Sequence, residues 1–168
     1  GGALRFMGGS GLKYRHLSES RMPMVPQVRP FFHARSNTWS YVVAAGDGGT
    51  AAIVDPVLDF DATSGRTGSA SAQALLDAVA ARGLRVDWIL ETHAHADHLS
   101  AAQWLKARLP GAKVAIGDGI RAVQQAFAPL FASGGGDGCA TDGSQFDHLF
   151  RDGERFDIGG IQATVIGV

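Results

Sequence analysis

The chain has 168 residues, of which 45% are hydrophobic and 18% charged, a composition that indicates a folded domain with a buried core and excludes general disorder. Its 23 glycines follow no Gly-X-Y period, which excludes collagen, and no apolar run reaches the ~18 residues of a membrane span. The net charge is −1, but residues 36–168 carry 9 basic and 15 acidic side chains. That acidic balance argues against a nucleic-acid or anionic-membrane partner.

The amino-terminal segment differs in composition from the remainder. Residues 1–24 are rich in glycine and basic side chains and lack hydrophobic periodicity, so we expect a disordered tail followed by a domain over residues 25–168. The single cysteine, Cys139, excludes an intramolecular disulfide and is typical of a reducing, cytoplasmic location. No basic residue lies within three positions of Cys139, so we do not expect a catalytic thiolate there.

Strand and helix patterns alternate along the chain, and regular structure is expected to begin near Thr38. Ser100 and Gln103 predict a capping box at the start of the second helix. The order of elements predicts a layered α/β domain. The predicted strands cover 38–43, 51–54, 86–92, 113–116, 155–158 and 161–166, the predicted helices cover 71–82, 100–109 and 119–131, and loops are expected at 46–49, 57–70 and 132–145.

The third predicted helix shows the clearest amphipathic pattern. Ile120, Val123, Phe127 and Leu130 recur at spacings of three, four and three, which places them on one helical face. We expect Phe127 to lie in the core, and we expect the same of Trp104 in the preceding helix.

One segment carries the residues of a metal site. His93, His95, Asp97 and His98 fall within six positions, with small alanines between them. His93 and His95 are two apart, so on leaving a strand they point to the same side, and Asp97 and His98 follow in the turn before the next helix. Imidazole and carboxylate ligands suit zinc, iron or nickel. Four such groups predict either two adjacent metal ions or one ion whose ligands are supported by the remaining side chains.

The alternative interpretation is a set of packing histidines beside a helix start, with Asp97 as a carboxylate at the helix amino terminus. Burying three unpaired imidazoles together would be costly, so we favour metal binding. Asp55 ends a predicted strand and would either contact a metal ligand from behind or cap a turn. His33 and His148 lie in polar surroundings, and we expect both to be exposed to solvent.

The motif residues from His93 to His98 after a hydrophobic strand resemble the signature of the metallo-β-lactamase superfamily. The wider run 89–100 and the segment 55–61 followed by 64–67 are similar to bacterial persulfide dioxygenases, which are related to glyoxalase II. The resemblance covers about residues 27–166 and implies an αββα sandwich. A later segment of the family pattern, Pro-Gly-His, is absent after Ile166, so we expect only the amino-terminal half of the sandwich and a domain incomplete at its carboxyl end.

The resemblance also implies roles for the motif residues. In hydrolase members the positions of His93 and His95 bind a first metal ion and those of Asp97 and His98 a second. In the dioxygenase branch a single Fe(II) is held at the position of His93 and by a later histidine and aspartate, while the other motif residues support them. The implied reaction oxidises glutathione persulfide with O2 to sulfite and glutathione.

Two further functions are weighed against the dioxygenase. One is a glyoxalase II-like hydrolase of a glutathione thioester, with one or two Zn(II) ions and Asp97 as the catalytic residue that orients the attacking water. The segment 55–67 favours the dioxygenase over this hydrolase. The other is an inactive metal-binding fragment, because the later histidine and aspartate ligands and the second half of the sandwich are expected to be absent. A half sandwich would also leave one sheet face exposed and favour self-association into a homo-oligomer.

Overall fold

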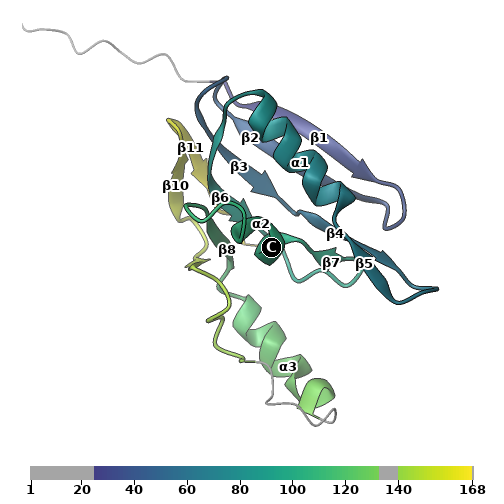
Figure 1. Cartoon of the computed structure of the whole chain (residues 1–168). Helices are drawn as coiled ribbons and strands as arrows, with labels where there is room; N and C mark the ends of the chain where they lie inside the picture. Colours follow the sequence, from purple (N-terminus) through teal and green to yellow (C-terminus); the bar gives the residue numbers. More distant parts are fainter. Residues whose placement is uncertain (1–24, 133–139, 168) are drawn as a thin grey trace, which may run out of the picture.

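The computed structural model describes residues 25–132 and 140–167 (Figure 1). The expected tail 1–24 and Cys139 lie outside these described ranges. Within them all the predicted helices and strands occur, together with five further strands that the sequence did not predict. The strands are β1 (Gln27–His33), β2 (Thr38–Ala44), β3 (Thr50–Val54), β4 (Val57–Asp61), β5 (Arg66–Gly68), β6 (Arg85–Leu90), β7 (Leu99–Ser100), β8 (Lys113–Gly117), β9 (His148–Phe150), β10 (Arg155–Ile158) and β11 (Ile161–Thr164), and the helices are α1 (Ala70–Ala81), α2 (Ala102–Lys106) and α3 (Ile120–Ala132).

A six-stranded mixed sheet forms the centre of the molecule, in the order β1-β2-β3-β6-β8-β9. Strands β1, β2 and β3 pair antiparallel, with the glycine-rich turn after β2 that the sequence predicts. Strands β3, β6, β8 and β9 then pair parallel. The carboxyl ends of these parallel strands therefore meet at one edge of the sheet, which is where α/β proteins commonly bind ligands.

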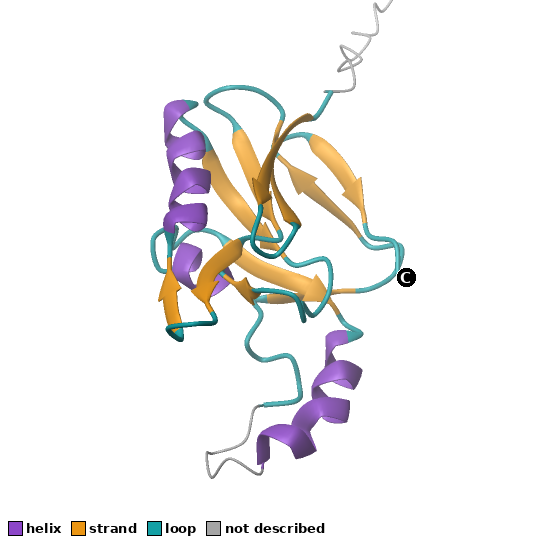
Figure 2. Cartoon of the chain, turned by 90° about the vertical axis from the view of Figure 1, so that its right-hand side faces the viewer, coloured by secondary structure: helices purple, strands orange, loops and turns teal. Residues whose placement is uncertain are grey.

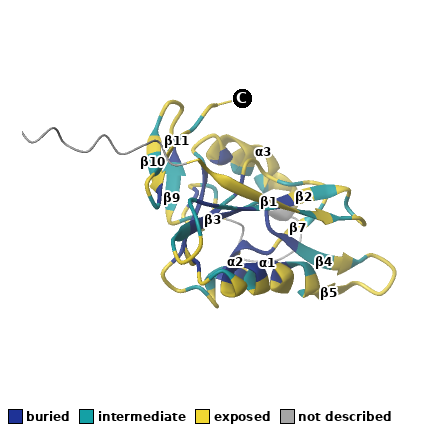
Figure 3. Ribbon diagram, turned by 90° about the horizontal axis from the view of Figure 1, so that it is seen from above, coloured by how far each residue is buried: buried dark blue, intermediate teal, exposed yellow. Residues whose placement is uncertain are grey.

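Helices α1 and α2 cover one face of this sheet and enclose the main core (Figures 2 and 3). Leu75 of α1 and Leu105 of α2 pack against Val42, Ile53 and Ile89 of the sheet, and all five side chains are fully buried. Burial of apolar surface at ~25 cal/mol per Å² makes this layer the main source of stability. The predicted layered α/β class is confirmed.

The alternation of side chains between the two faces of the sheet is interrupted in the middle of β6. Val86 and Ile89 are three residues apart, yet both belong to the core beneath the helices. The register with β3 shifts between Ala51 and Ala52, which pair with Val86 and Trp88. This irregularity inserts one extra residue into β6, so both flanking apolar residues face the same layer.

A second layer begins on the opposite face of the sheet. The β10–β11 hairpin lies there, as Figure 3 shows. Trp88 donates its indole N–H to the carbonyl of Asp157 at 3.1 Å and packs against Phe150 and Phe156, with ring centroids 5.4 and 5.5 Å away. The hairpin is the one that the sequence predicts across residues 159–160.

The prediction of a polar loop over 57–70 is wrong. Strand β4 pairs with β5 on one side and with the short β7 on the other, forming a separate three-stranded sheet. Asp61 stabilises the β4–β5 turn by accepting the N–H of Thr63 and the hydroxyl of Ser64. Asp59, the other acidic residue of the segment, instead accepts the N–H and the hydroxyl of Ser71 at the start of α1.

Regular structure also begins earlier than Thr38, because β1 pairs with β2 over its whole length. Most residues of this strand are exposed, and it contains Pro30, so the sequence pattern does not predict a strand here. An edge strand tolerates proline because one side of its backbone needs no partner. Strand β9 was likewise missed within the region after the glycine-rich loop.

Two predicted helices differ from the structure in detail. Helix α2 is shorter than predicted and lacks the reciprocal capping box, because Ser100 belongs to β7, although its hydroxyl does accept the N–H of Ala102. Helix α3 has the predicted extent but projects away from the sheets (Figure 1), so Phe127, 50% exposed, is not in the core. Trp104 does pack against the core. Among the described residues, no helix is both long and apolar enough to cross a bilayer.

Candidate metal centre

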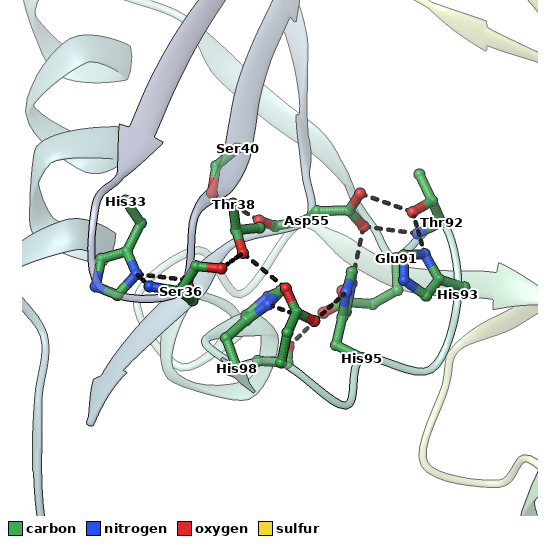
Figure 4. Close-up of polar contacts among 12 residues, drawn as sticks. His33, Ser36, Thr38, Ser40, Asp55, Glu91, Thr92, His93, His95 and His98 are labelled. Carbon is green, nitrogen blue, oxygen red and sulfur yellow. Dashed lines mark hydrogen bonds and ion pairs between the residues drawn. The ribbon is translucent and has the colours of Figure 1, made fainter. Parts of the chain in front are cut away.

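The histidine motif lies in the loop between β6 and β7, at the carboxyl edge of the parallel strands. Three other segments meet this loop: the start of β2, the end of β3 and strand β7. Figure 4 shows side chains from these segments pointing toward one another. The site is therefore built by residues from distant parts of the sequence around one short loop.

Asp55 links three strands at one point. Its N–H donates to the carbonyl of Leu90 at 2.8 Å, and its own carbonyl accepts the hydroxyl of Ser40 at 2.6 Å. Its carboxylate accepts both the N–H and the hydroxyl of Thr92 at 2.7 Å. Burial alone would raise the pKa of Asp55, but hydrogen bonds from His95 and Thr92 outweigh it and hold that pKa below its ordinary value. Asp55 is thus an ionised anchor for the motif loop.

His95 is held by two carboxylates at the same ring nitrogen. Its Nε2 lies 2.9 Å from Glu91 Oε2 and 3.1 Å from Asp55 Oδ1, and Glu91 also accepts the hydroxyl of Ser100. Burial lowers the pKa of His95, but the bonds to Asp55 and Glu91 outweigh burial and raise that pKa to about 10. Because Nε2 carries the shared proton, Nδ1 is the atom left to bind a metal ion, which would replace the proton on it.

His98 is the buried group that most needs a partner. Its side chain is 2% exposed, and neither ring nitrogen makes a hydrogen bond, although Nδ1 lies 3.3 Å from Asp97 Oδ1. One ligand atom from each of His95, Asp97 and His98 lies within 4.8 Å of the other two. An unsatisfied buried imidazole is costly, and a metal ion would satisfy it. The residues present therefore fit a metal ion.

Asp97 has the opposite environment, with a half-exposed side chain. Its Oδ2 accepts the hydroxyl of Thr38 at 2.8 Å. This hydrogen bond is the main reason that the pKa of Asp97 falls to about 2, with a smaller contribution from His98. Asp97 is consequently a carboxylate at any physiological pH.

His93 adjoins the cluster without belonging to its tightest part. Its ring centroid is 4.3 Å from that of His95, and its Nδ1 lies 2.9 Å from the hydroxyl of Thr92. It also lines a cavity of about 560 Å³ whose wall is mainly apolar and includes Phe150, Phe156 and Asp118. All four predicted ligands therefore lie side by side, and His93 faces the space that is large enough for a small molecule.

Four residues of the site were not anticipated from the sequence: Thr38, Glu91, Thr92 and Ser100. Glu91 is buried next to a strand end, and an acidic residue two positions before the first histidine was a usable signal. Thr38 lies 59 residues from its partner Asp97, so no local pattern connects them. The contact between Thr38 and Asp97 forms only because the sheet brings the start of β2 next to the motif loop.

The two histidines outside the motif behave differently from each other. His33 is mostly buried, with Nδ1 2.6 Å from the hydroxyl of Ser36 and Nε2 3.3 Å from Asp59, so the expectation of exposure is wrong. His148 lies in β9 and bonds Glu154 at 2.7 Å, but its side chain is 38% exposed. Neither belongs to the clusters that could hold a metal ion.

Comparison with known proteins agrees with this geometry. Residues 34–167 match the metallo-beta-lactamase superfamily. A beta-lactamase hydrolase-like protein of Agrobacterium fabrum is 45% identical over 148 residues, which are 88% of this chain and 33% of that protein. Persulfide dioxygenase ETHE1 of Bos taurus is 32% identical over 113 residues, 66% of this chain and 40% of that protein.

A solved metallo-beta-lactamase of Staphylococcus aureus matches with a TM-score of 0.58 over 84% of this chain and 33% of that one, at 18% identity, which supports the fold alone. The chain spans about a third to a half of the length of the curated relatives that it matches. With the family match over most of its length, the mixed sheet and the clustered histidine motif, this chain belongs to the metallo-β-lactamase superfamily.

Proposed function

We propose that the chain contributes the metal-binding motif of a non-haem Fe(II) persulfide dioxygenase. The reaction would consume glutathione persulfide, O2 and water and release glutathione and sulfite. The observation that carries metal binding is His98, buried with two unpartnered ring nitrogens beside His95 and Asp97. The similarity to a persulfide dioxygenase over 66% of the chain supports the choice of reaction.

The residues of the site would divide the work as follows. His93, His95, Asp97 and His98 would hold the metal ion or support its ligands. Iron(II), when bound, supplies the activation of O2 in such sites. Asp55 and Glu91 orient His95 through its Nε2, so that Nδ1 faces inward. The cavity beside His93 would receive the sulfur end of the substrate.

The second candidate is a Zn(II)-dependent hydrolase of a glutathione thioester, with one or two zinc ions. The state of Asp97 favours it, because an ionised and half-exposed carboxylate can accept a hydrogen bond from an attacking water and so orient it. In that case Asp97 would be the catalytic residue. The reaction would need no O2, which separates the two candidates experimentally. A chain that binds metal without catalysis is the third outcome.

One set of measurements tests these functions on the whole chain. Metal content is measured by elemental analysis after loading with Fe(II) or Zn(II), O2 uptake is followed with glutathione persulfide, and thioester cleavage is followed with a glutathione thioester. We expect stoichiometric metal in the wild type, loss of metal in His93→Ala and His98→Ala, and retention in the control His148→Gln.

The metal content, the O2 uptake and the thioester cleavage together distinguish the candidate functions. O2 uptake that requires iron supports the dioxygenase, and zinc-dependent cleavage without O2 uptake supports the hydrolase. Stoichiometric metal with neither activity identifies a metal-binding chain without catalysis. Wild-type protein that retains no metal would contradict the proposal as a whole. A cytoplasmic location is part of the proposal and rests on the single cysteine.

A further inference from the structure

The hydroxyl group of Thr38 stands between the turn before β2 and the metal motif. Its Oγ1 lies 2.8 Å from Asp97 Oδ2 and 3.2 Å from the carbonyl oxygen of Ser36. Both neighbours only accept hydrogen bonds, and a hydroxyl has a single proton to donate. The carboxylate is closer and charged, so the proton goes to Asp97.

This bond distinguishes the two oxygens of Asp97. Oδ2 is occupied by Thr38, whereas Oδ1 points to the histidines, 3.3 Å from His98 Nδ1 and 3.9 Å from His95 Nδ1. The side chain is half exposed, so packing alone does not prevent it from turning toward solvent. Holding Oδ2 in place therefore keeps Oδ1 directed toward the histidines.

Thr38 itself is held firmly. Its backbone pairs with His33 across the β1–β2 ladder, and the connecting turn includes Asn37 with a φ of 56°. Within that turn, His33 Nδ1 accepts the N–H of Ser36 at 3.3 Å, and His33 Nε2 lies 3.3 Å from Asp59 Oδ1. The hydroxyl therefore projects from the first residue of a paired strand, next to a hydrogen-bonded turn, and not from a free loop.

We propose that Thr38 is a positioning residue for Asp97, which holds Oδ2 so that Oδ1 faces the metal-binding histidines. The role goes beyond the four motif residues and extends the metal centre to the amino-terminal strands. Its consequence for metal affinity rests on the proposed function, but its effect on the Asp97 side chain does not. The two effects can therefore be measured separately.

The first measurement uses metal-free protein and needs no ligand. Three-bond NMR couplings that define χ1 of Asp97 are compared in the wild type, Thr38→Val and Thr38→Ser. We expect couplings of a single rotamer in the wild type and in Thr38→Ser, and averaged couplings in Thr38→Val, which keeps the shape but lacks the donor. Identical couplings in Thr38→Val and the wild type would overturn the proposal.

The second measurement is the affinity for Zn(II) or Fe(II), from competition with a chromophoric chelator. We expect Thr38→Val to bind about tenfold more weakly and Thr38→Ser to stay close to the wild type, because removing the partner of a metal ligand costs about 10–100-fold. The control Thr67→Val, on exposed strand β5, should bind as the wild type does.

Equal weakening in Thr38→Ser and Thr38→Val would mean that the methyl group or the turn, and not the hydroxyl, is responsible, and would overturn the proposal. Unchanged affinity in Thr38→Val would overturn it as well. If the wild type binds neither metal, the proposed function fails, while the couplings still decide the role of Thr38.

Discussion

His95 donates its Nε2 proton to the carboxylate of Glu91, with a distance of 2.9 Å between the two atoms. Glu91 is buried four residues earlier on the same loop and also accepts the hydroxyl of Ser100. A buried carboxylate that faces the back of a ligating histidine fixes the ring and its tautomer. The arrangement ties the end of β6 to the candidate metal centre. A substitution at Glu91 is therefore expected to affect metal binding, as a substitution at a predicted ligand would.

Replacing Glu91 with glutamine should weaken metal binding by about tenfold, because the amide holds the His95 ring less firmly and no longer selects its tautomer. The measurement is a chelator competition with Zn(II) on wild type and variant. Glu154→Gln is the matched control, since Glu154 bonds His148 at 2.7 Å outside the cluster. Equal losses in the two variants would contradict this role for Glu91.

Replacing His98 with leucine should remove metal binding and, at the same time, stabilise the metal-free protein. The leucine fills similar space without leaving two buried ring nitrogens unsatisfied, a penalty of about 1–3 kcal/mol. Urea unfolding of metal-free protein measures the change. His148→Leu, which loses a bond to Glu154, should not be stabilised. A less stable metal-free His98→Leu variant would show that His98 is satisfied in solution.

Metal-free protein should lose stability as the pH rises past neutrality. Burial lowers the pKa of His95, but the bonds to Asp55 and Glu91 outweigh it and raise the pKa from 6.5 to about 10. The stabilisation from protonated His95 is therefore complete below pH 6.5 and is lost as the pH rises through about 10. Urea unfolding across this window measures it. His95→Asn should show a flatter pH profile, and a wild-type profile as flat as that of the variant would contradict the assignment.

A separate prediction concerns the start of helix α1. Asp59 accepts the N–H and the hydroxyl of Ser71 at 2.9 and 2.6 Å, and these bonds overcome the effect of burial and lower the pKa of Asp59. Asp59→Asn should cost about 1 kcal/mol of unfolding free energy at neutral pH, as loss of a helix cap does.

The contribution of Asp59 should be present above its ordinary pKa of 3.8 and vanish as the pH falls through the lowered value. Thermal unfolding at several acidic pH values follows this loss. Asp77→Asn, an exposed change within the same helix, serves as the control. A difference between Asp59→Asn and the wild type that persists at the lowest pH would argue against a titrating cap.

The sequence was most informative where the signal is local. The period of Leu75 and Val79 and the stop at Gly83 placed α1 almost to the residue, and the spacing of His93 to His98 predicted side chains that the structure brings together. Asp55 also emerged from its position at a strand end. These features depend on neighbours within one turn or one strand, so composition and spacing describe them well.

The sequence was least informative where distant segments meet. Strand β1 is exposed and contains Pro30, and it exists because β2 offers a partner. The bond between Thr38 and Asp97 spans 59 residues and requires the β2 turn and the β6 loop to converge. Phe127 shows the opposite error, since an amphipathic pattern states which residues share a face and not what covers that face.

The backbone of Asp55 limits what this position can become. Its φ of 47° is unfavourable for most side chains, and Pro56 follows directly. Glycine, asparagine and aspartate tolerate that conformation, but only aspartate also offers two anionic oxygens to Thr92 and His95. The backbone conformation and the hydrogen bonds of the carboxylate, two independent requirements, therefore favour the same amino acid at this position.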